Sequence, residues 1–259
     1  MELKQKTALV CGASRGIGLG AAEALAQKGC KVILLGRTEA DLQSNVTAIN
    51  AINKQDNQYV VVDLGNIEEL KVKVSDLVET QDIHIVINNS GGPAPGLLVD
   101  ATTDQLIAAF THHILASHTI AKIVIPSMKK AGYGRIINVV STSVRQPIPG
   151  LGVSNTIRGA MGSWSKTLAN EVGQHNITVN NILPGATKTG RLQQIIDKKQ
   201  SQLAGTDQSA EANMQSSIPL GRFAEVSEVA GVIAFLASPG GSYISGTSIP
   251  VDGGRLKCI

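Results

Sequence analysis

Short runs of apolar, mostly β-branched residues alternate with segments of helical periodicity along the whole chain. The runs predict seven strands, over residues 7–12, 31–36, 59–63, 83–88, 135–140, 177–183 and 248–251. Most of these runs lack the strict alternation of a half-exposed strand. Continuous apolar runs are typical of strands buried on both faces of a parallel sheet.

The segments between the runs carry apolar stripes at helical spacing. One stripe follows Gly152 and consists of Ile157, Ala160, Met161, Trp164 and Leu168. Thr102 and Gln105 have the spacing of a capping box and predict the start of a long helix that runs towards Met128. Strand–helix alternation requires right-handed crossovers, so the chain is predicted to be an α/β protein with a doubly wound Rossmann fold, a seven-stranded parallel sheet and helices on both faces.

One segment does not follow the alternation of strands and helices. Residues 187–217 are polar, rich in Gln and Ser, and longer than a connection in a compact domain needs to be. Inserted segments of this length are typically lids over a binding site, and the alternative is a surface excursion without a role. Because no linker, repeat or composition break divides the chain, we expect one domain over residues 1–259 with a substrate lid at about 187–217.

Composition narrows the function classes. The chain has 259 residues, 42% of them hydrophobic and 17% charged, which fits one large globular domain. Its net charge of +3 is small and scattered, so neither nucleic acid nor a membrane surface is expected as a partner. Cys11, Cys30 and Cys258 are odd in number and widely spaced, which indicates no disulfide framework and no metal site. With no segment typical of a signal peptide or a membrane span, we expect a cytoplasmic protein.

The first predicted strand ends in a glycine-rich segment, Gly12-Ala13-Ser14-Arg15-Gly16-Ile17-Gly18, and a helix follows directly. Glycines at this point allow a tight turn and a close approach of the backbone to a pyrophosphate, which then faces the free N–H groups of the helix N-terminus. Such a segment by itself could be a structural turn. On the first strand of an alternating α/β chain it predicts nucleotide binding.

The end of the second predicted strand bears on the choice of nucleotide. An NAD site has a carboxylate there for the ribose 2′-hydroxyl, whereas an arginine accommodates a 2′-phosphate. Here Gly36 removes the carboxylate, and Arg37 and Arg15 supply positive charge, so NADP(H) is predicted over NAD(H). The alternative is that both arginines are solvated surface residues. Asp63 could accept a hydrogen bond from the adenine amino group or simply form a turn at the strand end.

Several further motifs follow along the chain. They are Asp63-Leu64, Asn88-Asn89-Ser90-Gly91, Ser141, Asn180 to Gly185 with Thr189, and Val251-Asp252-Gly253-Gly254. Together with the glycine-rich segment they resemble the short-chain dehydrogenase/reductase family, most closely its 3-oxoacyl-acyl-carrier-protein reductase-like branch, from about residue 5 to the C-terminus. The resemblance implies that Asn89, Ser90 and Gly91 lie along the adenosine and ribose. It also implies that Pro184, Gly185, Thr187 and Thr189 hold the carboxamide and phosphate side.

The same resemblance implies a reaction in which a tyrosine protonates the substrate oxygen, aided by a lysine four residues later, a serine and an asparagine. The serine is Ser141, but the tyrosine position is Ser154, the lysine position is Arg158, and the asparagine position is His113. The chain therefore departs from the family pattern at three of four catalytic positions, which puts the source of the proton in doubt.

The replacements differ in what they can do. Ser154 is a far weaker acid than a phenol, so it is either a hydrogen-bond donor or a small residue that fills the gap. Arg158 shares a helical face with Ser154 and offers a permanent cation with a planar fork, for ribose hydroxyls or for an anionic substrate group. His113 would titrate near neutrality and is the hypothetical relay, through Ser154 or a water, although a packed histidine without a role is the alternative. His112, beside His113, is expected to point to another side of the helix and to be structural.

Two functions fit these observations. The first is an NADP(H)-dependent oxidoreductase that transfers a hydride between nicotinamide and a small carbonyl or alcohol, with a 3-oxoacyl thioester as one candidate substrate. The second is a nucleotide-binding sensor or assembly protein without oxidoreductase turnover. The resemblance also implies a homodimer or homotetramer, and the stripe that contains Trp164 could serve the interface or the core.

Overall fold

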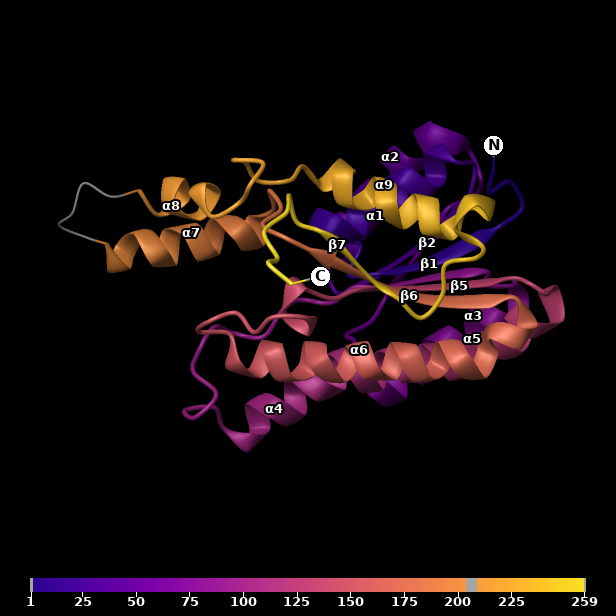
Figure 1. Cartoon of the computed structure of the whole chain (residues 1–259). Coiled ribbons are helices and arrows are strands. Elements are labelled where there is room, and N and C mark those ends of the chain that lie inside the picture. The colour runs from indigo at the N-terminus through magenta and orange to yellow at the C-terminus, as the bar shows by residue number, and fades with distance from the viewer. Residues whose placement is uncertain (1, 204–208, 259) are drawn as a thin grey trace.

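Figure 1 shows the fold of the chain in a computed structural model, which describes residues 2–203 and 209–258. Seven parallel strands form one sheet in the order β3-β2-β1-β4-β5-β6-β7. Their bounds are β1 Thr7–Cys11, β2 Lys31–Gly36, β3 Gln58–Val61, β4 Ile85–Asn88, β5 Gly134–Val139, β6 Ile177–Pro184 and β7 Ser248–Val251. Each predicted strand is present, with its ends within two residues of the prediction.

Helices cover both faces of this sheet. The long helices α1 (Gly16–Gln27), α2 (Glu39–Asn53) and α9 (Val226–Ala237) lie on one face, and α3 (Ile67–Thr80), α5 (Ala116–Ala131) and α6 (Gly152–Val172) lie on the other (Figure 1). Neighbouring residues of β1 point to opposite faces, Leu9 into the apolar cluster with α3 and α5 and Val10 into the cluster with α1 and α9. Burial on both faces explains the continuous apolar runs, and the predicted doubly wound fold is confirmed.

The long helix predicted to start at Thr102 has a more complex course. The capping box of Thr102 and Gln105 is present, and α4 (Thr103–Phe110) follows it. A π-helix, Thr111–Leu115, then connects α4 directly to α5. A π-helical turn inserts extra backbone into the helix, so it changes which side chains face the sheet.

The segment expected as an inserted lid is mostly helical. It contains α7 (Gly190–Gln202) and α8 (Ala210–Ser216), which project from the body of the molecule (Figure 1). A small apolar cluster of Leu192, Ile196, Ile218 and Phe223 packs beneath these helices. Residues 204–208 of the expected lid lie outside the described residues.

Short 3₁₀ helices complete the described elements: η2 (Thr142–Val144), η3 (Gly173–His175) and η4 (Pro239–Gly241). None of the helices within residues 2–203 and 209–258 has the length and apolar character needed to cross a membrane.

The packing of Gly18 yields a test of the turn that precedes α1. A Cβ atom at Gly18 would clash with the carbonyl oxygen of Gly12, which is backbone and cannot move aside cheaply. We therefore expect Gly18→Ala to lower the free energy of unfolding by about 1–3 kcal/mol, as overpacking does. Chemical denaturation measures this change. The control is Gly231→Ala in α9, where a Cβ atom meets nothing within 4 Å. This substitution should raise the free energy of unfolding by about 0.4–1 kcal/mol. Equal stability of the two variants would contradict the prediction.

Candidate functional site

The glycine-rich turn between β1 and α1 has the backbone geometry of a phosphate-binding turn. Gly12 and Gly16 have φ angles of +59° and +61°, which side-chain-bearing residues rarely adopt. The Asn89 side-chain amide donates to the carbonyls of Cys11 (3.3 Å) and Gly12 (3.2 Å) and so ties the turn to the end of β4. At the start of α1 Arg15 makes no side-chain cap, and the first turn contains no acidic residue. Its N–H groups therefore remain available to an anion.

Residues of α2, β2 and α1 also hold the turn in place. The Asn45 side chain on α2 donates to the carbonyls of Ala13 (3.3 Å) and Ser14 (3.0 Å). A Cβ atom at Gly36 would lie 2.8 Å from Ser14 Oγ, so the glycine at the end of β2 lets Ser14 approach. Ile17 packs against the apolar cluster beneath α1 and anchors the start of the helix. Asn45 was missed in the sequence, where nothing distinguishes it from other polar helix residues.

Charged residues gather where β2 and β3 end. Arg37 Nη1 lies 3.6 Å from Asp63 Oδ2, and both side chains are substantially exposed. The Gly65 N–H donates to Asp63 Oδ1 at 2.8 Å, and His112 Nε2 lies 3.3 Å from the same oxygen. The pKa of Asp63 is lowered, first by the Gly65 hydrogen bond and then by the positive charge of Arg37 and by His112. Asp63 is therefore ionised, with Arg37 held beside it.

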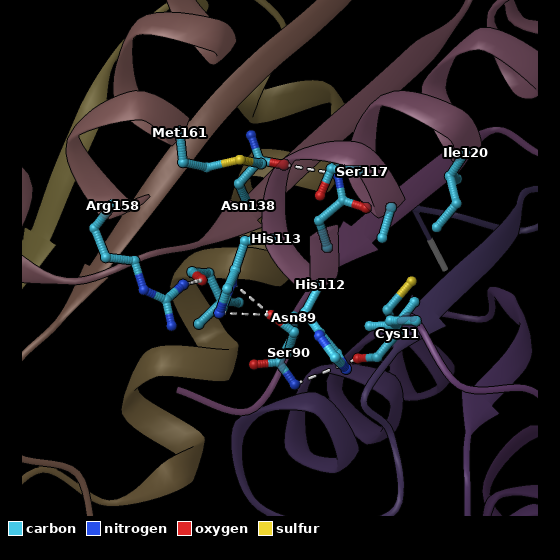
Figure 2. Close-up of a pocket in the computed structure, with 14 residues that line it drawn as sticks. Cys11, Asn89, Ser90, His112, His113, Ser117, Ile120, Asn138, Arg158 and Met161 are labelled. Carbon is cyan, nitrogen blue, oxygen red and sulfur yellow. Dashed lines mark hydrogen bonds between the residues drawn. The ribbon is translucent and has the colours of Figure 1, made fainter. Parts of the chain in front are cut away.

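A narrow cavity of about 10 Å³ lies beneath the ends of β1, β4 and β5 (Figure 2). This volume is about that needed for one water molecule. Five of the residues predicted for the site come together around it: Leu64, Asn89, Ser90, His113 and Arg158. The other lining residues are Cys11, Asn88, His112, Ala116, Ser117, Ile120, Asn138, Val139 and Met161. Ser141 and Ser154 are not among the lining residues.

His113 is buried in this cavity and does not behave as predicted. Its Nδ1 lies 2.6 Å from Ser90 Oγ (Figure 2). Burial, and then the charges of Arg158 and His112, lower the pKa of His113 to about 3, although a hydrogen bond to Gly91 acts in the opposite direction. The expectation that His113 titrates near neutrality is therefore wrong, because a low-dielectric site beside a fixed cation disfavours the imidazolium.

The expected relay partner of His113 lies elsewhere. No hydrogen bond joins His113 to Ser154, whose side chain makes none within the described part of the chain. Ser141 follows β5 and caps η2, and its Oγ accepts from the Ser143 N–H at 3.2 Å. The relay from His113 through Ser154 is consequently not supported by direct contact.

His112 was expected to point away from the site, and this expectation is also wrong. It lines the same cavity as His113, and its ring packs against Gly65. The π-helix makes this possible, because its wider turn directs His112 towards the end of β3 and His113 towards the end of β4.

Arg158 places a cation inside this region. It is 7% exposed, and its Nη1 donates to the carbonyl of Val139 at 3.0 Å. Burial lowers the pKa of Arg158 to about 10, so the guanidinium is still charged at neutral pH. Figure 2 shows it reaching from α6 towards the ring of His113.

The three tyrosines of the chain all lie away from this cavity. Tyr59 bonds to Glu39, the Tyr133 hydroxyl donates to the carbonyl of Ala237, and Tyr243 is fully exposed. Tyr243 therefore does not take the place left at position 154.

The loop after β6 approaches the glycine-rich turn from the other side. Pro184 ends β6, and the Gly185 N–H donates to the carbonyl of Val251 at 2.9 Å. Thr187 is buried and pairs with Ala224 in a parallel bridge. Thr189 caps α7, and its Cγ2 would lie 3.4 Å from a Cβ atom at Gly16. Of the predicted phosphate-side residues, Thr189 therefore lies close to the turn.

Among the polar cavity residues, Asn88 belongs to a motif recognised in the sequence, whereas Asn138 and Ser117 were missed. The position of Asn138 near the end of β5 is the one signal that could have identified it. Within residues 2–203 and 209–258, no group of three or more His, Cys, Asp or Glu residues could hold a metal ion.

The low pKa of His113 makes stability depend on pH. The value in the folded protein, about 3, lies below the usual 6.5, so the unfolded chain binds the proton first as the pH falls. Protonation therefore favours unfolding, and stability is lost from about pH 6.5 downwards. We expect wild type to lose about 2 kcal/mol more than His113→Asn between pH 7 and pH 5, at about 1.4 kcal/mol per pH unit.

Urea denaturation across this pH range measures the difference between the two proteins. Unfolding at pH 8, where the imidazole is neutral in both states, gives the packing cost of the substitution itself. Parallel stability curves from pH 8 to pH 5 would show that His113 is protonated as readily in the folded protein as in the unfolded chain.

Comparison with known proteins identifies the family. A family model described as enoyl-(acyl carrier protein) reductase matches residues 12–255. The NADPH-dependent reductase BacG of Bacillus subtilis is 30% identical over 99% of this chain and all of the relative. The 3-oxoacyl-[acyl-carrier-protein] reductase FabG of Pseudomonas aeruginosa is 30% identical over 98% of both chains. The crystal structure of L-sorbose reductase from Gluconobacter frateurii, complexed with NADPH and L-sorbose, superposes with a TM-score of 0.91 at 28% identity, covering 100% of this chain and 99% of that one. The sheet order, the glycine-rich turn and these likenesses together establish that the chain belongs to the short-chain dehydrogenase/reductase family.

Proposed function

We propose that the protein is an NADP(H)-dependent oxidoreductase that transfers a hydride between nicotinamide and a small carbonyl or alcohol. The observation that carries this proposal is the uncapped N-terminus of α1 behind the glycine-rich turn, with exposed arginines at positions 15 and 37 and no carboxylate at the end of β2. The relatives named as NADPH-dependent support the same cofactor. A sensor without turnover is not favoured, because the relatives described above are oxidoreductases.

The chain offers a complete set of residues to hold the cofactor. In this proposal the turn from Gly12 to Gly18 receives the pyrophosphate, and Arg15 and Arg37 receive the 2′-phosphate. Asp63 and Leu64 lie at the adenine, and Asn89, Ser90 and Gly91 lie along the ribose. The nicotinamide side is assigned to Pro184, Gly185, Thr187 and Thr189, and Arg158 can serve either the ribose hydroxyls or an anionic group of the substrate. The approach of Thr189 to Gly16 supports placing both segments around one ligand.

The chemistry follows from the residues that replace the usual proton donor. NADPH supplies the hydride when it is bound. We propose that the hydroxyl groups of Ser141 and Ser154 donate hydrogen bonds to the carbonyl oxygen and so position the substrate. As the carbonyl carbon accepts the hydride, the electron pair of the C=O bond moves to the oxygen, which then takes a proton from water. Water is the proposed donor because the hydroxide that it leaves can exchange with the solvent, whereas His113 is neutral.

We also propose that residues 187–217 cover the substrate. Two contacts support this role. Arg191 Nη2 on α7 donates to the carbonyl of Pro93 at 3.0 Å, which ties the segment to the loop after β4. The same loop is joined to the start of α6, because the Gly96 N–H donates to the carbonyl of Gly150 at 2.8 Å. The segment and the loop therefore meet above the strand ends.

A homo-oligomer is part of the same proposal. Its support is a set of exposed apolar side chains on α4 and the π-helix, Ile107, Phe110 and Leu115. Exposed apolar surface of this kind often marks a contact between subunits.

The proposal is tested by mixing purified protein with NADPH and a panel of ketones and 3-oxoacyl thioesters. We expect at least one carbonyl class to oxidise NADPH. The loss of absorbance at the band of the reduced nicotinamide measures this oxidation. Tight NADPH binding without oxidation anywhere on the panel would favour the sensor.

Arg37 provides the test of cofactor choice. Replacing it by aspartate removes a charged partner of the 2′-phosphate and adds repulsion, so Arg37→Asp should raise the Kd for NADPH roughly 10–150-fold, the range expected for a charge-assisted hydrogen bond. The Kd for NADH should change little. Fluorescence titration with both coenzymes measures the two values, with Arg145→Asp, outside the proposed nucleotide site, as the control. Equal loss of affinity for both coenzymes would remove Arg37 from 2′-phosphate recognition.

Position 154 provides the test of the proton source. A phenol there would restore a stronger acid than water or serine, and general acids typically contribute about 10²–10⁴-fold. We therefore expect Ser154→Tyr to raise kcat at least tenfold for a ketone that the wild-type protein reduces. Ser154→Phe is the matched control without a hydroxyl and should not raise kcat. Steady-state rates under saturating NADPH decide the matter. If both variants leave kcat where it is, proton supply is not what limits the reaction.

A further inference from the structure

Arg158 carries a buried charge that the protein does not compensate. Only 7% of the residue is exposed, and its single hydrogen bond to protein goes from Nη1 to the Val139 carbonyl. Arg158 Nε is cut off from solvent and has no hydrogen-bond partner. The guanidinium thus keeps a buried N–H group, that of Nε, without a partner.

Within the described part of the chain, no carboxylate balances this cation. The cavity that Arg158 lines contains amide, hydroxyl, imidazole, thiol and apolar groups but neither aspartate nor glutamate. Asp63 is engaged by Arg37 and His112 instead. Burial alone perturbs the pKa of Arg158, whereas an acidic neighbour would act in the opposite direction. Arg158 lines the same cavity as His113, and Figure 2 shows it reaching towards the His113 ring.

A buried cation without a partner is unfavourable, and an arginine cannot relieve the cost by losing its proton as a lysine can. An anionic ligand would relieve it. The phosphates of the cofactor are served in the proposed function by the N-terminus of α1 with Arg15 and Arg37. The ribose offers hydroxyl groups, which accept hydrogen bonds but bring no charge. The remaining anion is one that the substrate carries.

The geometry points to a carboxylate. A guanidinium has two parallel N–H groups that match the two oxygens of a carboxylate, and such bidentate pairs are stronger and more directional than single hydrogen bonds. Arg158 lies one helical turn after Ser154 on α6, and its Nη1 bonds to the carbonyl of Val139, two residues before Ser141. We propose that Arg158 binds a carboxylate of the substrate, so that the protein interconverts oxo acids and hydroxy acids. This inference rests on the proposed oxidoreductase function and names its substrate class.

The test compares matched acids and esters with the full chain and NADPH. The pairs are 2-oxobutyrate, 3-oxobutyrate and 4-oxopentanoate, each with its methyl ester, together with the uncharged N-acetylcysteamine thioester of 3-oxobutyrate. We expect at least one acid to exceed its ester, and the thioester, at least 30-fold in kcat/KM. Arg158→Lys keeps a cation but loses the planar fork, so it should lower the ratio of kcat/KM for the acid to kcat/KM for its ester at least tenfold. Arg145→Lys, an exposed arginine four residues after Ser141, is the matched control and should leave the preference intact.

A binding measurement separates the two proposals. Butanoate should raise the Tm of the wild-type NADP⁺ complex, whereas butanamide, its neutral isostere, should not, and Arg158→Lys should abolish the shift. Kd for NADPH, measured by fluorescence, should change less than threefold in Arg158→Lys.

Three results would overturn the carboxylate assignment. The first is ester or thioester reduction as fast as acid reduction in wild type. The second is an NADPH Kd that rises in Arg158→Lys by as large a factor as the acid-to-ester ratio falls, which would assign the guanidinium to the ribose. The third is the absence of any Tm shift with butanoate. A butanoate shift lost in Arg158→Lys, without oxidation of NADPH by any compound, would support the carboxylate site and refute the oxidoreductase function.

Discussion

The carboxyl ends of the parallel strands are held together by a network of buried amides, and the loops that form the site start from these ends. The Asn88 amide donates to Asn138 Oδ1 at 2.7 Å, and the Asn138 amide donates to Asn181 Oδ1 at 3.1 Å, which links β4, β5 and β6. Ser165 on α6 joins the network through both Asn138 and Asn181. In a low-dielectric interior such bonds are strong, and leaving one unmade is costly. The network therefore holds α6 and three strand ends in one arrangement.

The same low dielectric decides the electrostatics of the site. A cation at Arg158 keeps its charge because a guanidinium is too basic to lose its proton, and it keeps the neighbouring His113 neutral. Outside the cavity, next to His112, Asp63 is ionised and paired with Arg37. The π-helix between α4 and α5 connects Asp63 with the cavity, because it carries both His112 and His113. A neutral imidazole and a fixed cation make a site suited to orienting a polar ligand rather than to donating a proton.

Much of the fold could be predicted because its signals are local. Apolar runs marked the strands, the capping box marked the start of α4, and the glycines at positions 12, 16 and 18 marked the turn. The segment from 187 to 217 was harder. Its polar composition suggested an inserted loop, yet Leu192 and Ile196 stand four residues apart on one face of α7 and pack into their own small cluster. A helix that buries only a narrow apolar stripe gives a weak periodic signal.

The sequence by itself determined the sheet, the glycine-rich turn and which residue types stand at the catalytic positions, because these depend on neighbouring residues and on spacing. Only the tertiary structure decided that His112 reaches Asp63, that His113 bonds to Ser90 and not to Ser154, and that Arg158 has no acidic partner among the described residues. Each of these depends on which distant segments meet and on how much solvent they exclude. The charge state of a histidine or the compensation of an arginine is a property of that enclosed environment, and no local pattern along the chain records it.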